Sequence, residues 1–377
     1  MLGIGTREVN CMNIRCSGWI YVFCFSLVSG FAQQNGPTGQ SEPPASVPFG
    51  SADRRMTLDV VVTDKSGKPV SGLGQQDFTL LDNKQPQKIL SFQAVEGGTA
   101  TADPPVEVIL LVDEVNTAFT NVATERNEIE KFLRRNGGAL AQPVSMIFLS
   151  DSGTTETTSS RDGNAVIADM NQKQFGLRTI RKSQGIYGAE DRIQLSLNAL
   201  QQLTNSETTR PGRKLVVWIS PGWPFLNAPG MDANLGSKQR QQIFNFIVGV
   251  SDALRQARIT LYNVDPLGLA DAVQFRTTEY MLFAKGVKTA GQAQNGNLAL
   301  QVLAYQSGGR VLNSSNDVGG EIATCVADAN AFYVLSFDGL PGDGPNEYHA
   351  LEIKIDKPGL TARTRSGYYA QPEAHQP

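Results

Sequence analysis

The chain has few of the residues, and none of the short motifs, on which most catalytic centres depend. It contains two histidines in 377 residues, His349 in a predicted hairpin and His375 near the carboxyl end. A Ser-His-Asp relay therefore has one credible candidate histidine. The patterns G-x-S-x-G, G-x-G-x-x-G, G-x-x-x-x-G-K, C-x-x-C and H-E-x-x-H do not occur. From these absences we predict that the protein is not an enzyme.

A strong charge of one sign is also lacking, and so are long hydrophobic runs. The formal net charge of -3 is spread along the chain without like-charge blocks, which predicts no nucleic-acid partner. The apolar run of residues 18–28 has about half of the roughly 20 residues that span a bilayer. Because Arg15 precedes it and small residues lead to Ala32, we predict a signal peptide over residues 1–32 and a secreted or periplasmic protein. The alternative is a retained membrane helix.

Cysteine is scarce outside this leader. Three of the four cysteines lie within the predicted signal peptide, which leaves Cys325 as the only thiol of the mature chain. An intrachain disulfide is therefore excluded. Cys325 lies at helical spacing from Ile322 and Val326, which indicates a buried apolar position. Pairing between two chains is the alternative.

The first folded segment is predicted to be short and entirely β. Residues 33–52 are rich in Gln, Pro, Gly and Ser, which is typical of a flexible linker. An N-terminal β segment over residues 53–98 follows, because β-rich runs alternate there with Gly-containing turns. Its predicted strands are Met56–Val62, Phe78–Leu81 and Ile89–Val95. So small a set of strands needs partners from elsewhere in the chain.

Residues 104–330 have the texture of an α/β domain, in which continuous apolar runs alternate with amphipathic helices. The predicted strands are Val106–Val112, Val144–Leu149, Lys214–Ile219, Ile259–Val264 and Arg310–Leu312. The predicted helices are Val122–Arg135, Ala189–Leu203, Ser237–Ala257, Asn297–Gln306 and Val318–Asn330. This order predicts a doubly wound, Rossmann-like and mostly parallel sheet with right-handed crossovers.

The carboxyl end returns to β texture. Residues 331–370 contain the predicted strands Phe332–Phe337, Tyr348–Ile355 and Leu360–Tyr369, and residues 371–377 form a tail. We predict that these strands pair with the segment 53–98 to form a small β-sandwich, into which the α/β domain is inserted. The alternative places the two β segments on opposite sides of the α/β domain.

The most informative local feature is the hydrophobic strand Val108–Asp113, which ends in an acid and is followed by Glu114-Val115-Asn116-Thr117. At this point the sequence resembles the von Willebrand factor A family, and more closely the exported A-domain-related proteins abundant in acidobacteria. The resemblance extends over residues 56–370. The segments that carry it are, in order, Val60–Val70 with Asp77-Phe78, Arg213–Ser220, Thr260–Asp265, Ser307–Arg310, Phe332–Ser336 and Arg365–Tyr369.

The resemblance implies a Rossmann-like domain that binds protein partners, often through a divalent cation. In the family the cation is held by a D-x-S-x-S loop, a distant Thr and an Asp in a later D-G turn. Here Asp113 keeps the first position and Thr117 can replace the second serine, but Val115 cannot coordinate. Pro221 stands where the later acid is expected, and residues 185–192 contain no threonine.

We therefore predict a degenerate metal site and no obligatory cofactor. Asp113 and Thr117 alone would bind magnesium or calcium weakly. A rebuilt site would add further strand-end residues, namely Glu114, Asp151, Ser220 and Asp265. The alternative is that these acids cap the following helices or lie in solvent.

Binding to a protein partner is predicted at the carboxyl edge of the sheet. Trp223 and Phe225 lie in a loop stiffened by Pro and Gly, which is typical of interface anchors. The alternative is that both rings fold back onto the sheet. Residues 265–296 are a further candidate for a partner-binding insertion or a lid. The competing functions are a cation-dependent adhesion module with a rearranged site and a hydrolase, which would need a pocket enclosing Ser220, Asp151 and a histidine.

Overall fold

The computed structural model describes residues 54–96, 106–172, 185–226, 235–268 and 278–373. The predicted signal peptide (1–32), the predicted linker (33–52) and His375 lie outside the described residues, as does most of the tail. No helix in the described ranges is long and apolar enough to cross a membrane.

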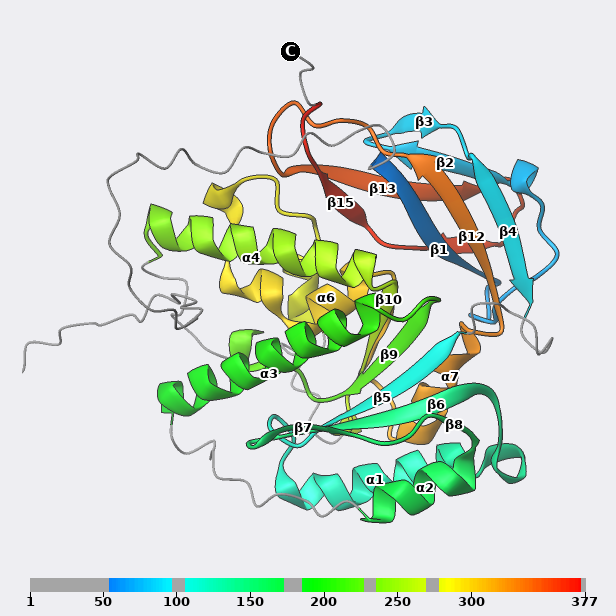
Figure 1. The fold of residues 1–377 in the computed structure, drawn as a ribbon, viewed down its shortest axis with the longest axis vertical. Coiled ribbons are helices and arrows are strands. Elements are labelled where there is room, and N and C mark those ends of the chain that lie inside the picture. Colours follow the sequence, from blue (N-terminus) through cyan, green and yellow to red (C-terminus); the bar gives the residue numbers. More distant parts are fainter. Residues whose placement is uncertain (1–53, 97–105, 173–184, 227–234, 269–277, 374–377) are drawn as a thin grey trace, which may run out of the picture. The chain divides into compact units, whose positions relative to one another are not determined.

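The main sheet is mixed, with five parallel strands and an antiparallel outer edge (Figure 1). In space its strands follow the order β11-β10-β9-β5-β6-β7, with β8 also paired to β6. Numbered along the chain, these six are 6-5-4-1-2-3, the common doubly wound order. Their bounds are β5 Glu107–Asp113, β6 Ala139–Ser150, β7 Gly153–Glu156, β8 Ser160–Asp162, β9 Lys214–Ile219, β10 Ile259–Val264 and β11 Val311–Leu312.

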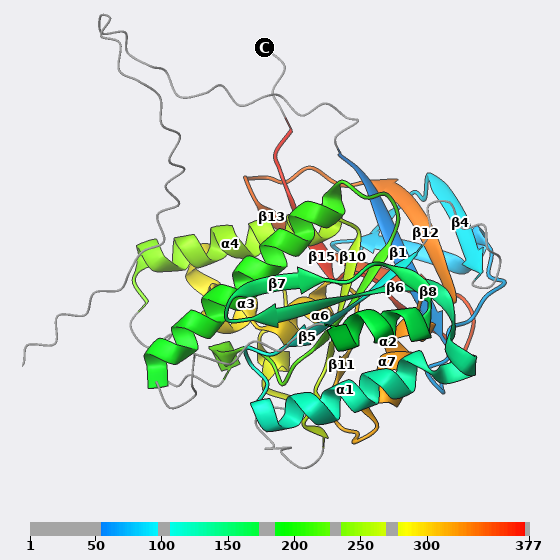
Figure 2. The same cartoon turned by 60° about the horizontal axis from the view of Figure 1, so that its bottom comes forward.

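Helices cover both faces of the main sheet, because successive residues of a buried strand point to opposite sides. Ile109 and Leu111 of β5 pack in one core cluster with α3, α4 and α6. Val108 and Leu110 pack in the other cluster with α1, α2 and α7 (Figure 2). The helices are α1 Phe119–Leu133, α2 Gly163–Gln172, α3 Gly185–Thr208, α4 Ser237–Gln256, α6 Leu300–Gln306 and α7 Val318–Ala327. Cys325 lies on α7 and is buried in this second cluster, which confirms the apolar position predicted for it.

Two antiparallel four-stranded sheets combine strands from both ends of the described chain. One has the order β14-β1-β12-β4 and the other β15-β13-β2-β3, and their apolar side chains share a third core cluster. The pairing of β1 with β12 joins the N-terminal and C-terminal β segments directly. The strands are β1 Arg55–Thr63, β2 Phe78–Asp82, β3 Gln85–Gln87, β4 Ser91–Glu96, β12 Ala331–Asp338, β13 Glu347–Ile355, β14 Thr361–Arg363 and β15 Gly367–Ala370.

Two predicted elements differ in extent from the observed ones, and other observed elements were not predicted. The single strand predicted over residues 360–369 is two strands, since β14 pairs with β1 and β15 pairs with β13 of the other sheet. The helix predicted from Asn297 begins at Leu300, after a 3-10 turn at Asn295–Leu298. The outer strands β7 and β8 were not predicted, because their polar residues show no apolar alternation. The helix α2 was not predicted either.

Candidate functional site at the carboxyl edge of the sheet

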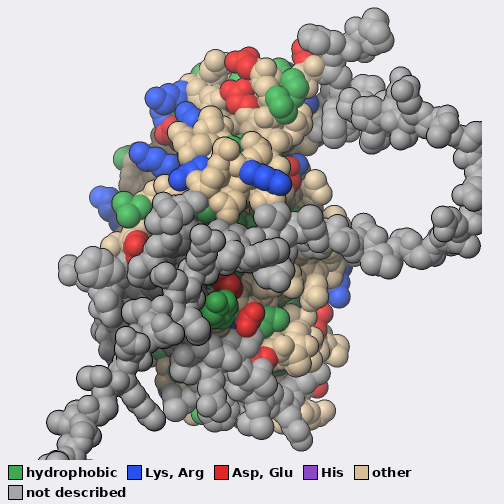
Figure 3. All heavy atoms as spheres, turned by 90° about the vertical axis from the view of Figure 1, so that its left-hand side faces the viewer, with side chains coloured by type: hydrophobic (Ala, Val, Ile, Leu, Met, Phe, Trp, Pro, Cys, Tyr) green, Lys and Arg blue, Asp and Glu red, His purple; other side chains and the backbone are tan. Residues whose placement is uncertain are grey.

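The strand order reverses between β5 and β9, and crevices at such switch points are where open α/β sheets bind ligands. β5 ends at Asp113 and β9 ends at Ile219. We call this end of the main sheet the carboxyl edge. Helices α1, α3 and α4 begin on this side, at the left of Figure 1. In the described part of this face, acidic and hydrophobic side chains lie together (Figure 3).

Asp113 is fully buried at the carboxyl edge, and its carboxylate is held by donors of the protein. Asn116 donates to it twice, from its backbone N to Oδ1 and from Nδ2 to Oδ2, both at 2.9 Å. Trp218 of β9 donates from Nε1 to Oδ2 at 3.0 Å. Burial raises the pKa of Asp113, and hydrogen bonds from Asn116, Trp218 and Ser220 oppose that rise.

Asn116 also fixes the loop to helix α3. Its Nδ2 donates to Ser196 Oγ at 2.9 Å, and that hydroxyl in turn donates to the carbonyl oxygen of Arg192 at 2.8 Å. Asp113, Asn116 and Ser196 therefore form one buried polar chain from the sheet to the helix. Asn116 lies between two candidate ligands in the sequence, but its own role could not be predicted, because Ser196 is 80 residues away.

The positions expected to coordinate a cation are occupied differently. Val115 packs in the core cluster under α3 and α4. Ser220 Oγ accepts a hydrogen bond from the backbone N of Gly222 at 3.1 Å, which fixes the turn through Pro221. Thr117 is buried beside Asp113, and its backbone N donates to the Asp113 carbonyl oxygen at 3.2 Å. In the described ranges no three His, Cys, Asp or Glu residues are arranged to hold a metal ion.

The other acids predicted for a rebuilt site lie around this point. Glu114 is half-buried. Burial raises its pKa to about 7; the positive charge of Arg126 opposes this rise, and the negative charges of Asp113 and Asp151 add to it. Asp265 is buried, and its Oδ1 accepts the backbone N–H of Leu267 at 3.0 Å. Asp265 thus stabilises its own turn.

Glu125 on α1 is a member of this acidic group that the sequence analysis missed. It is 1% exposed, and neither carboxylate oxygen has a hydrogen-bond partner among the described residues. Burial raises its pKa well above the ordinary value, and Asp113, Glu114 and Asp265 raise it further. The signal was present, since Glu125 lies between Val122 and Ile129 on the apolar face of the predicted helix.

Replacing Glu125 by methionine, which has a similar volume and no charge, is expected to stabilise the protein by about 1–3 kcal/mol near pH ~8. A carboxyl whose pKa is raised on folding contributes stability that is complete below its ordinary value of 4.5 and is lost as the pH rises through the folded value. The wild type should therefore lose stability as the pH rises past about 5, and Glu125→Met should flatten this loss. Urea unfolding near pH ~5 and pH ~8 measures both.

The matched control is Glu352→Met, because Glu352 is exposed on β13 and the same substitution there should change stability by less than about 0.5 kcal/mol. If Glu125→Met is less stable than the wild type at pH ~8, the prediction is wrong, because the folded protein then stabilises the Glu125 carboxylate.

Trp223 and Phe225 are not exposed anchors, so the partner-binding role predicted for them is corrected. Trp223 is 1% exposed and Phe225 9%. Trp223 packs edge-on against Trp218, with ring centroids 5.1 Å apart. The reason is the backbone at Gly222, whose φ of 98° turns the chain back, where a Cβ would lie 2.1 Å from Gln301 Nε2. The alternative, in which both rings fold back onto the sheet, is the arrangement observed.

The described part of residues 265–296 is fixed to the body of the protein. Val287 and Ala293 belong to the core cluster, and Tyr369 of β15 donates from its hydroxyl to the Val287 carbonyl oxygen at 3.1 Å. Two hydrophobic side chains of this segment are exposed, Met281 at 50% and Leu282 at 79%.

His349, which a hydrolase would need, is committed elsewhere. It lies on β13, where its Nδ1 is 2.9 Å from Asp82 Oδ1 on β2 and 3.3 Å from the Tyr368 hydroxyl on β15. Ser220 lies at the carboxyl edge of the main sheet. The structure therefore does not bring this histidine together with Ser220 and Asp151.

No family model and no curated protein matches the chain. Among solved structures it is similar to the pilus adhesin SpaC from Lactobacillus rhamnosus GG in its open conformation, with 10% identity and a TM-score of 0.35. That match covers 81% of this chain and 42% of the adhesin chain. A second structure of the same adhesin gives 10% identity, a TM-score of 0.34, and coverage of 80% and 49%. The chain thus spans less than half of either adhesin chain, and scores of this size do not define a shared fold.

Proposed function

We propose that the chain is an exported protein-binding and adhesion module with a von Willebrand factor A-like domain, which binds its partner at the carboxyl edge without an obligatory cation. The observation that carries this proposal is the closed environment of Asp113. Three N–H groups from Asn116 and Trp218 hold the carboxylate that would otherwise coordinate the metal.

The chemistry of hard cations explains why this arrangement favours cation-independent binding. Magnesium and calcium require several oxygen ligands, and a partner carboxylate needs an open coordination position. Asp113 has no exposed surface, and both of its oxygens already accept hydrogen bonds. A cation would have to displace the donors and gain ligands that Val115 and Pro221 cannot provide.

Two further observations support the family and the position of the binding surface. The main sheet has the doubly wound order, with its switch point between β5 and β9. Most of the segments that carry the resemblance in sequence overlap observed strands, namely β1, β9, β10, β12 and β15, whereas Ser307–Arg310 lies between α6 and β11. At the carboxyl edge, Glu114 is the acid that is partly exposed and directly beside the buried Asp113.

We expect envelope proteins of the source cell to bind the immobilised protein equally well in EDTA and in magnesium or calcium. Glu114→Arg is expected to reduce this binding at least about tenfold, because it replaces a partly exposed acid of the carboxyl edge with a positive charge. The matched control is Glu352→Arg on the exposed face of β13, which should bind as the wild type does.

Binding that disappears in EDTA and returns with calcium or magnesium would overturn the cation-independent mechanism. It would favour the alternative cation-dependent module, with Asp113, Thr117, Glu114, Asp151, Ser220 and Asp265 as its candidate ligands. If the Glu114→Arg and Glu352→Arg proteins bind the envelope proteins equally well, the partner surface lies away from the carboxyl edge.

A further inference from the structure

The outer edge of the main sheet is an open strand. β7 and β8 run antiparallel along β6, at the end of the strand order, and no described strand lies on their other side. In the segment between β7 and β8, the backbone N of Thr157 donates to the Met146 carbonyl oxygen at 2.9 Å, so the backbone N–H of Thr157 points toward β6. Because facing alternates along an antiparallel strand, Thr155 also faces β6, whereas the N–H and C=O groups of Thr154 and Glu156 point outward.

Nothing in the sequence of this edge blocks the addition of another strand. Thr154, Thr155 and Glu156 are all exposed, although Thr154 Oγ1 donates a hydrogen bond to Gln202 of α3, so the outer edge of β7 is accessible. Native proteins protect such edges with proline, lysine or a covering element. Residues 153–160 instead carry four threonines, which favour the extended conformation, and no proline or lysine.

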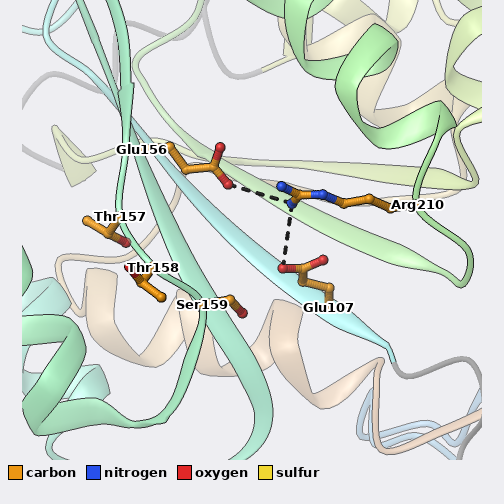
Figure 4. Close-up of a pocket in the computed structure, with 6 residues that line it drawn as sticks. All are labelled: Glu107, Glu156, Thr157, Thr158, Ser159 and Arg210. Carbon is orange, nitrogen blue, oxygen red and sulfur yellow. Dashed lines mark ion pairs between the residues drawn. The ribbon is translucent and has the colours of Figure 1, made fainter.

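An acidic cleft lies beside this edge. Its volume is about 510 Å³, and it is lined by Glu107, Glu156, Thr157, Thr158, Ser159 and Arg210 (Figure 4). The carboxylates of Glu107 and Glu156 both approach Arg210.

The charges of the cleft are incompletely balanced. Arg210 Nη1 is 3.2 Å from Glu207, 3.7 Å from Glu156 and 4.0 Å from Glu107, so its closest pair is with buried Glu207. The nearby Lys214 is buried and donates to the carbonyl oxygens of Glu207 and Ala257. Glu107 and Glu156 therefore share one arginine at distances of 3.7–4.0 Å, which leaves their negative charges incompletely compensated.

We propose that this edge binds an extended segment of a protein partner as an added β-strand, with a lysine or arginine of that segment placed in the cleft, beside the carboxylates that Arg210 compensates incompletely. In this mode of recognition the backbone hydrogen bonds supply affinity and a pocket beside the edge supplies specificity. The site is distinct from the carboxyl edge and does not rest on the cation-independent binding proposed there.

The test uses fluorescein-labelled Thr-Val-Lys-Val-Lys-Val-Thr and the same peptide with glutamate in place of lysine. In fluorescence anisotropy we expect the lysine peptide to bind at least about tenfold more tightly. Thr154→Pro removes an outward N–H that makes no bond to β6, so it should weaken binding about tenfold without changing the melting temperature. Thr154→Val is the matched control, which keeps the N–H and should bind as the wild type does.

The double variant Glu107→Gln, Glu156→Gln should abolish the preference for the lysine peptide, and Glu114→Arg should leave peptide binding unchanged. N-methylation of alternate amides removes the N–H donors along one edge of the lysine peptide and so tests the added strand without altering the protein. The peptide methylated on the edge that would pair with β7 should not bind. Equal affinity for the lysine and glutamate peptides would overturn the proposal, as would tight binding of the edge-blocked peptide. A dimer in sedimentation that Thr154→Pro dissociates, without peptide binding, would assign the edge to a second copy of this chain and overturn it too.

Discussion

Asp113→Ala is expected to lower the free energy of unfolding by about 3–5 kcal/mol, one of the two largest losses for a single substitution in this protein. The substitution removes the acceptor of three N–H groups, two on Asn116 and one on Trp218, all of them buried. Buried donors without acceptors lose their hydration and regain nothing. Urea unfolding of the two proteins measures the difference.

Two controls separate this role of Asp113 from metal binding. Trp218→Phe removes one of the three donors and keeps an aromatic ring, so it should cost less than Asp113→Ala. Unfolding of the wild type should be the same in EDTA, magnesium and calcium. A wild type that is stabilised by calcium or magnesium, with the gain absent from Asp113→Ala, would contradict the closed site.

Asp328→Ala is expected to cost a similar amount, about 3–5 kcal/mol, at the junction between the α/β part and the antiparallel sheets. Asp328 follows α7 and is fully buried. Its Oδ2 accepts the Tyr262 hydroxyl of β10 at 2.9 Å and Nη2 of Arg363 on β14 at 2.5 Å, and its Oδ1 is 3.7 Å from Nη2 of Arg310. Removing the acid leaves the buried Tyr262 hydroxyl without its acceptor and the partly buried guanidinium groups of Arg363 and Arg310 without a counter-charge.

The exposed ion pair of Asp338 and Arg55 provides the control, and Asp338→Ala should cost less than about 1 kcal/mol. The double variant Asp328→Leu, Arg363→Met should recover part of the loss, because a buried ion pair can be replaced by apolar side chains at little cost. If Asp328→Ala loses less than about 1 kcal/mol in urea unfolding, the junction does not depend on this network.

The central part of the fold was predictable because burial on both faces leaves a simple pattern. The strand from Val108 to Val112 is a continuous apolar run, and each of these residues is fully buried in the structure. The outer strand β7 was missed for the opposite reason, since Thr154, Thr155 and Glu156 are exposed and carry no apolar signal.

The candidate site was predictable only in part. The sequence places Asp113 at the end of a buried strand, and places Val115 and Pro221 where a cation would need ligands. It gave no indication that Trp223 would be buried, because a loop of Pro, Gly and aromatic residues suits an exposed anchor as well as a folded-back cap. The positive φ of Gly222 turns the loop back, so that Trp223 packs onto the sheet.

By itself, the sequence determined the order of the elements and placed Val115 and Pro221 at positions where the family resemblance leads one to expect cation ligands, because both depend on residue type along a local segment. The tertiary structure alone decided which groups surround Asp113. Trp218 is 105 residues from Asp113, and its indole reaches the carboxylate because β9 lies beside β5 in a register that pairs Leu111 with Trp218. Hydrogen bonds over such separations depend on strand neighbours and register, which local pattern does not specify.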